Sequence, residues 1–168
     1  MSECLDGRVG GAPAWPGPTG EAATTRARRR AFPGRPDQVA QARRFAQRAL
    51  EGCPVADEVI LCVSELATNA LLHTASGNGG KFTVILQRGE SWVWVAVCDE
   101  GSDKSPAARA LGAVSEDGRG LGLVAIIADH WGELSDNHGR AVWIELRWDT
   151  ALPTRRYGER PQRDSVPG

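Results

Sequence analysis

The sequence predicts an α+β fold, a two-layer α/β sandwich whose mixed, mostly antiparallel sheet carries helices on one face. Two observations lead to this fold class. Amphipathic helical segments come first along the chain, and two pairs of β-rich runs follow, each pair joined by a short turn. A chain of 168 residues with 41% hydrophobic residues is long enough for one globular domain with a buried core.

Both ends of the chain lack the periodicity of secondary structure. Residues 1–31 are rich in glycine, proline and alanine and include the basic run RARRR (26–30), so we expect a disordered tail. The default interpretation of this run is a solvated tail, and the alternative is an electrostatic contact with an acidic partner. Residues 151–168 are expected to form a second flexible tail. The ordered domain is therefore predicted to span residues 32–150.

Two helices are predicted in the first half of this domain. Residues 36–51 open with proline, place apolar side chains at helical spacing and end before Gly52, as in an amphipathic helix. Pro54 then interrupts the chain. A second helix is predicted over residues 55–73.

Strand pairs dominate the second half. The runs KFTVILQR (81–88) and WVWVAVCD (92–99) predict an antiparallel hairpin. Residues 100–119 are expected to form a long loop, and LGLVAIIADH (121–130) a short buried helix that Gly132 closes. A second hairpin is predicted from residues 133–136 and 140–148. Trp92 and Trp94 share one strand face, where core or interface packing is the default and a partner-binding patch the alternative.

Composition excludes several classes of protein. The formal charge of −1 gives no bulk attraction to nucleic acid or an anionic membrane. The four cysteines form no CxxC pair, so we expect reduced thiols and neither a disulfide framework nor a zinc site. The N-terminus lacks the apolar stretch of a signal peptide, and no segment approaches the roughly 18 apolar residues of a membrane span. We expect a soluble, intracellular protein.

The helix predicted over residues 55–73 carries an unusual polar stripe. Its segment LCVSELATNALLHT is mostly apolar, yet Glu65, Asn69 and His73 recur at fourfold spacing on one face. Apolar residues border this stripe on both edges, with Leu61 and Leu72 on the far side. The stripe is either the wall of a pocket or a polar face that a loop partly shields.

Two further segments can carry chemistry. The strand ending in VAVCDEGS brings Asp99 to a strand end, where a carboxylate can accept a hydrogen bond from an exocyclic amine such as that of adenine; a common turn is the alternative. The segment DGRGLGLVAIIADHWG places three alternating glycines before an apolar helix, so main-chain amides can point at phosphate. Its GxGxG spacing is neither a Rossmann fingerprint nor a P-loop and is weak evidence alone.

Taken in order, the segments Glu-x-x-x-Asn (65–69), Asp-x-Gly (99–101) and GxGxG (118–122) resemble the ATP-binding domain shared by gyrase, heat-shock chaperone, sensor histidine kinase and mismatch-repair ATPases. Within that superfamily the chain is most similar to the small anti-sigma factor serine kinases, through SELATNALLH, VCDEG, GRGLGLVAIIADHWG and GRAVW. The resemblance covers residues 32–148 and implies a Bergerat-type fold.

This resemblance also implies roles for individual residues. Asn69 would hold Mg²⁺ through its side-chain oxygen, and Glu65 would act as the base that accepts the proton of the attacking hydroxyl. Asp99 would bind the adenine amino group, and Gly101 would let the base approach. For His73, a place at the phosphate end and a capping or core role both stay open. The lid and phosphate cradle would consist of Gly118, Arg119, Gly120, Leu121 and Gly122.

The implied function is that of an ATP-dependent serine/threonine protein kinase of the anti-sigma factor type. Its phosphoacceptor would be an anti-sigma factor antagonist protein, and its other partner a sigma factor. The resemblance further suggests a homodimer. The cysteine usage, charge and hydropathy described above predict a cytoplasmic protein without direct contact to nucleic acid or membrane. The alternative is an ATP-gated protein-binding module with little or no kinase activity, in which ATP orders the lid over residues 100–119.

Two residues weigh on that choice. Glu65 favours catalysis. Ala141 matches a position where the superfamily often carries a threonine that helps Asp99 to hold adenine, and it mildly favours the binding module. One lost hydrogen bond of roughly 1 kcal/mol would weaken ATP binding without abolishing it.

Overall fold

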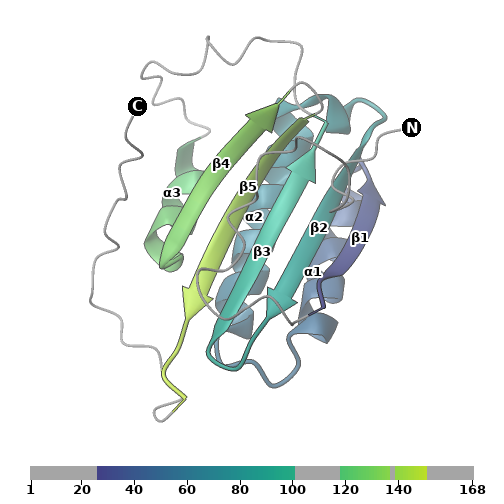
Figure 1. The fold of residues 1–168 in the computed structure, drawn as a ribbon. Coiled ribbons are helices and arrows are strands. Elements are labelled where there is room, and N and C mark those ends of the chain that lie inside the picture. Colours follow the sequence, from purple (N-terminus) through teal and green to yellow (C-terminus); the bar gives the residue numbers. More distant parts are fainter. Residues whose placement is uncertain (1–25, 101–117, 137–138, 151–168) are drawn as a thin grey trace.

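The structure is a computed structural model that describes residues 26–100, 118–136 and 139–150 (Figure 1). Its elements follow in the order β1 (Arg28–Pro33), α1 (Asp37–Ala49), α2 (Ala56–His73), η2 (Ala75–Gly77), β2 (Lys81–Arg88), β3 (Trp92–Asp99), α3 (Gly118–Ile127), β4 (His130–Asp136) and β5 (Gly139–Arg147). The five strands form one sheet in the order β1-β2-β3-β5-β4, and each neighbouring pair is antiparallel. The α+β fold class is confirmed, although the described sheet is antiparallel and not mixed.

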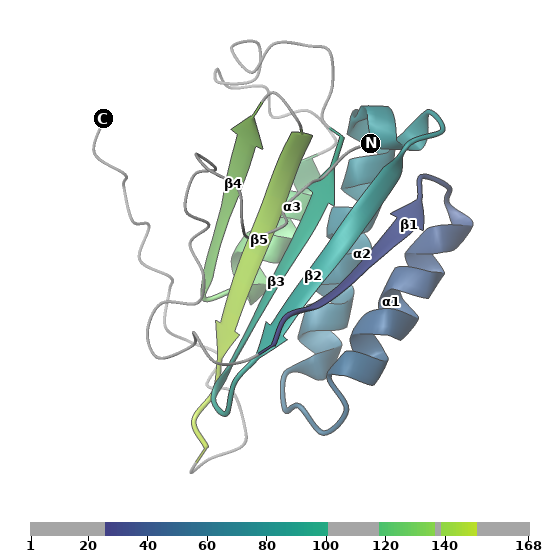
Figure 2. The same cartoon turned by 45° about the vertical axis from the view of Figure 1, so that its right-hand side comes forward.

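All three helices cover the same face of the sheet (Figures 1 and 2). Helix α1 packs against β1 and β2, α2 against β2 and β3, and α3 against α2 and β4. Strand β3 alternates, so Val93, Val95 and Val97 point into the core beneath Val59 and Val63 of α2. Each fully buried valine contributes roughly 1.5–3 kcal/mol. This packing places α2 across the centre of the sheet.

The opposite face of the sheet carries a smaller apolar cluster. Trp94, Ala96 and Cys98 of β3 are buried there together with Ala141 of β5, and Trp92 packs against them. The period-two alternation of a strand puts the two tryptophans on one face, as predicted. Their packing in an apolar cluster is confirmed.

Strand β1 corrects the predicted boundary of the N-terminal tail. Residues 28–31, expected to be disordered, pair with β2 in register, with Arg28 opposite Leu86. Phe32 is 1% exposed and stacks on Phe82 with ring centroids 5.3 Å apart. Pairing with the edge of β2 and the contact of Phe32 with Phe82 hold residues 28–31 in a strand, although the side chains of the arginines in it are exposed. The rest of the predicted tail, residues 1–25, lies outside the described residues.

The region after the predicted long loop also differs from expectation. Helix α3 begins at Gly118 and ends at Ile127, so it starts and ends three residues earlier than predicted. Gly132 does not close a helix. It lies in β4 opposite Trp143, whose indole would be 2.8 Å from a β-carbon at this position. Residues 101–117 of the predicted loop lie outside the described residues.

The described cysteines form no disulfide. Cys53, Cys62 and Cys98 are buried reduced thiols, as predicted, and Cys4 lies outside the described residues. Among the helices of the described ranges, none is both long and apolar enough to cross a membrane.

Candidate functional site

The polar stripe of α2 lies at the edge of the hydrophobic core between the helices and the sheet. Glu65, Asn69 and His73 are half-buried and follow one another at one-turn intervals. Neighbouring Leu66 and Ala70 are buried against the sheet side. The apolar residues on the far edge are exposed: Leu61 at 42% and Leu72 at 70%. The stripe therefore lies between the core and solvent, where its carboxylate and amide can reach a ligand without prior unfolding.

Asp99 ends β3 on the helix-covered side of the sheet. Asp99 is only 4% exposed, and its side chain lies on the same face of β3 as the core residues Val95 and Val97. Gly139 approaches this strand end closely: its φ is 154°, and a β-carbon there would lie 2.2 Å from the main-chain oxygen of Asp99. Glycine at the start of β5 thus allows the main chain of this strand to lie directly against the main chain of Asp99.

The strand register corrects the role expected for Ala141. Asp99 pairs with Arg140, whereas Ala141 pairs with Cys98 and is buried in the cluster on the helix-free face. A shift of one residue reverses the side to which a strand side chain points. Ala141 therefore does not occupy the position of a threonine beside Asp99. The prediction that it costs a hydrogen bond to adenine was wrong.

Arg140 occupies the helix-facing position instead, and the sequence analysis missed it. Arg140 is 8% exposed, and its guanidinium donates to both carboxylate oxygens of Glu133 at 2.6 and 2.9 Å. This two-pronged geometry joins β5 to β4 next to the end of β3. The segment GRAVW by itself does not predict the ion pair of Arg140 with Glu133, because this pair depends on the pairing of β4 with β5.

A hydroxyl clamp joins the end of α2 to the sheet. Ser76 is completely buried; its Oγ donates to the carbonyl of Lys81 at 2.7 Å and accepts the N–H of Glu100 at 3.0 Å. The N–H of Ser76 donates to Oγ1 of Thr74 at 3.2 Å, and that hydroxyl donates to the carbonyl of Ala70 at 2.5 Å. The clamp connects the last turn of α2 with the start of β2 and the residue that follows β3. No sequence pattern predicted either hydroxyl, and the segment TASG directly after the helix is their only local signal.

The predicted phosphate cradle forms the beginning of α3. Residues 118–122 all lie in this helix, so Gly118 and Arg119 belong to a helix and not to the predicted loop. Leu121 is half-buried against the core, and among the described residues no group beyond the adjoining helix backbone comes within 4 Å of the place of a β-carbon at Gly122. The first turn of a helix leaves main-chain N–H groups without helical acceptors, and its dipole attracts anions. Gly101 lies outside the described residues.

The helix packing brings these parts into one half of the domain. Helix α2 contacts both α3 and β3, so the stripe lies on a helix that packs against the helix with the predicted cradle and against the strand that ends in Asp99. The fold therefore provides a buried carboxylate, a half-buried carboxylate and amide one turn apart, and a helix N-terminus on the same side of the sheet. Such a set suits a ligand with an amine at one end and phosphates at the other.

Comparison with known families identifies this arrangement. The sequence profile of the histidine kinase-like ATPase domain matches residues 32–147, which is most of the chain and nearly all of the described structure. No curated protein matches the chain significantly. The family match supports ATP binding, usually together with Mg²⁺.

Proposed function

Because the chain belongs to the histidine kinase-like ATPase domain family, we propose that it is an ATP-dependent serine/threonine protein kinase of the anti-sigma factor type. Its phosphoacceptor would be a serine or threonine of an anti-sigma factor antagonist, and modification of that antagonist would control sequestration of a sigma factor in the cytoplasm. The observation that carries this proposal is the pair Glu65 and Asn69, a carboxylate and an amide one turn apart on a half-buried helical face.

The donor chemistry of the described residues fits a nucleotide with Mg²⁺. Asp99 is buried, and its carboxylate would accept a hydrogen bond from the amino group of adenine. The side-chain oxygen of Asn69 is a hard ligand of the kind Mg²⁺ prefers, and one protein ligand suffices because this ion retains water and takes phosphate oxygens. When bound, Mg²⁺ supplies positive charge that offsets the charge of the phosphates. Amides at the start of α3, over residues 118–122, supply further donors to phosphate.

Glu65 would serve as the general base. In the transfer, the hydroxyl oxygen of the acceptor residue bonds to the γ-phosphorus, the bond from that phosphorus to the ADP oxygen breaks, and Glu65 takes the hydroxyl proton. Its position one turn before Asn69 puts the carboxylate near the phosphate end of the site without making it a metal ligand. A half-buried glutamate stays accessible to a protein substrate, as this role requires.

Transfer of labelled phosphate tests the proposal. The full chain is incubated with γ-labelled ATP, Mg²⁺ and candidate antagonist proteins, in parallel with Glu65→Gln and Asn69→Asp. We expect Glu65→Gln to keep ATP binding and to lose transfer by about a hundredfold or more, in the range usual for general-base removal. Glu58→Gln is the matched control, since it makes the same change on α2 two turns away from Glu65.

Three outcomes separate the alternatives. Transfer that disappears in Glu65→Gln and persists in Glu58→Gln supports the kinase. ATP binding without transfer to any candidate supports the nucleotide-gated binding module in its place. Absence of ATP binding by the unmodified chain overturns both proposals. Light scattering during size-exclusion chromatography tests the homodimer that the resemblance implies.

A further inference from the structure

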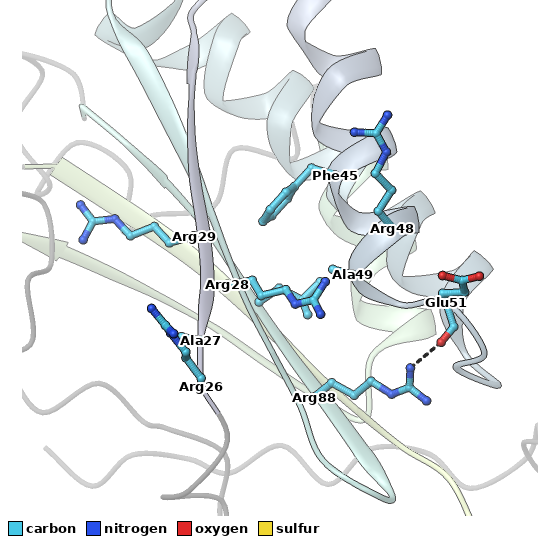
Figure 3. Close-up of a pocket in the computed structure, with 10 residues that line it drawn as sticks. Arg26, Ala27, Arg28, Arg29, Phe45, Arg48, Ala49, Glu51 and Arg88 are labelled. Atoms are coloured by element: carbon cyan, nitrogen blue, oxygen red, sulfur yellow. Dashed lines mark hydrogen bonds between the residues drawn. The ribbon is translucent and has the colours of Figure 1, made fainter.

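A concave site lies at the end of the sheet opposite to Asp99. Strand β2 ends there at Arg88, whereas β3 runs the other way and ends at Asp99. The site is a groove of about 1130 Å³ between the start of β1 and the end of α1 (Figure 3). We call it the arginine groove and define it by the residues that line it: Arg26, Ala27, Arg28, Arg29, Phe45, Arg48, Ala49, Glu51, Leu86 and Arg88.

The charge of this groove contrasts with that of the whole chain. Five arginines line it against the single carboxylate of Glu51, although the chain carries a formal charge of −1. Arg28 and Arg48 are exposed on opposite walls, one on β1 and one on the last turn of α1. Arg88 is held in place, because its guanidinium donates to the main-chain oxygens of Glu51 and Gly52 at 2.8 and 3.2 Å. Positive charge is thus concentrated over a few side chains and partly fixed in position.

The floor and rim of the groove point to a polypeptide ligand. Leu86 is buried and Phe45 half-buried, so the arginines surround an apolar base. Strand β1 is the edge of the sheet and pairs only with β2 among the described strands. An open strand edge can form main-chain hydrogen bonds with an extended peptide, and the apolar surface next to it can bind a side chain of that peptide.

The C-terminal segment of the chain is a poor candidate for this groove, because residues 151–168 contain four arginines and two acidic side chains. Residues 1–25 contain three acidic side chains and one arginine, so charge alone does not exclude the N-terminal segment. A nucleic acid is a weaker candidate, because the formal charge of −1 gives no bulk attraction for a long polyanion outside the groove. We propose that the arginine groove binds an acidic segment of a partner protein, with apolar side chains on Phe45 and Leu86 and carboxylates on the arginines.

This proposal goes beyond the kinase activity and does not rest on it. The probe is a fluorescein-labelled peptide of about ten residues, rich in glutamate with two leucines, which is long enough to cover the strand edge. Fluorescence anisotropy measures its binding to the full chain, and the same peptide with glutamine in place of glutamate tests the need for charge. Single-stranded oligonucleotide of similar length tests nucleic acid as the competing class of ligand.

Two double variants test the location. Arg28→Gln with Arg48→Gln removes one exposed charge from each wall of the groove. The matched control, Arg43→Gln with Arg44→Gln, removes two exposed charges from α1 outside the groove. ATP affinity is measured for both variants as a readout of folding that is independent of the peptide.

We expect salt-sensitive binding of the acidic peptide, weakened about tenfold or more by the groove variant and changed less than about twofold by the control. ATP binding should be unchanged in both. Failure of the unmodified chain to bind the acidic peptide, or equal loss in the two variants, would overturn the proposal. Tighter binding of the oligonucleotide that depends on Arg28 and Arg48 would also overturn it and assign the groove to nucleic acid.

Discussion

Replacement of Ser76 by alanine removes one hydroxyl that makes two hydrogen bonds inside the fold. Its Oγ donates to the carbonyl of Lys81 and accepts the N–H of Glu100, and the residue is 0% exposed. Two net hydrogen bonds contribute about 2 kcal/mol, and the main-chain groups left without this partner raise the loss to about 2–3 kcal/mol. We therefore expect Ser76→Ala to lower the free energy of unfolding by this amount and the Tm by about 6–10 °C.

Urea unfolding followed by tryptophan fluorescence measures this loss. The matched control is Ser64→Ala on α2, whose Oγ donates to the carbonyl of Ile60 at 2.9 Å. A helical carbonyl of that kind already accepts a main-chain N–H, so its loss should cost less than about 0.5 kcal/mol. We also expect weaker ATP binding in Ser76→Ala, because the clamp joins the last turn of α2 to the end of β3. Equal stability of the two variants would refute the clamp.

Three further predictions concern single residues. Gly139→Ala should lower the free energy of unfolding by about 2 kcal/mol or more in chemical denaturation, because its β-carbon would meet the main-chain oxygen of Asp99; a variant as stable as wild type contradicts this close approach. Glu133→Gln should lower the free energy of unfolding by about 1 kcal/mol, because it weakens the two-pronged ion pair with Arg140, which is partly exposed on the glutamate side. This loss of stability should become smaller at high salt, and a loss that salt does not change argues against a charge effect. Burial raises the pKa of the Cys53 thiol above its ordinary value of 9.0, so native protein should react with iodoacetamide at pH 8 more slowly at this residue than urea-unfolded protein. Equal alkylation rates in the native and the urea-unfolded protein would exclude the raised pKa. For the same reason, the stability that the neutral Cys53 thiol contributes is complete below pH 9 and declines as the pH rises through the pKa of the folded state.

Local patterns predicted the central elements well. Strands β2 and β3 coincide with the runs KFTVILQR and WVWVAVCD, and α2 begins within one residue of its predicted start. Alternation in a strand and helical spacing are properties of neighbouring residues, so they can be read without the rest of the fold. The prediction failed at β1, where pairing with the distant strand β2 decided the structure, and at the end of α3, where His130 and Trp131 pair with β5.

The sequence by itself determined the family and the residue types of the candidate site, because Glu65, Asn69 and Asp99 lie in short motifs whose order along the chain is informative. Only the tertiary structure decided which side chains lie next to Asp99. The β3–β5 register put Arg140 there and turned Ala141 to the other face. Such pairings join segments far apart in the chain, and a one-residue shift reverses every side chain, so neither composition nor spacing could specify them. The hydroxyl clamp and the arginine groove arise for the same reason, since each assembles groups that meet only when helix and sheet pack together.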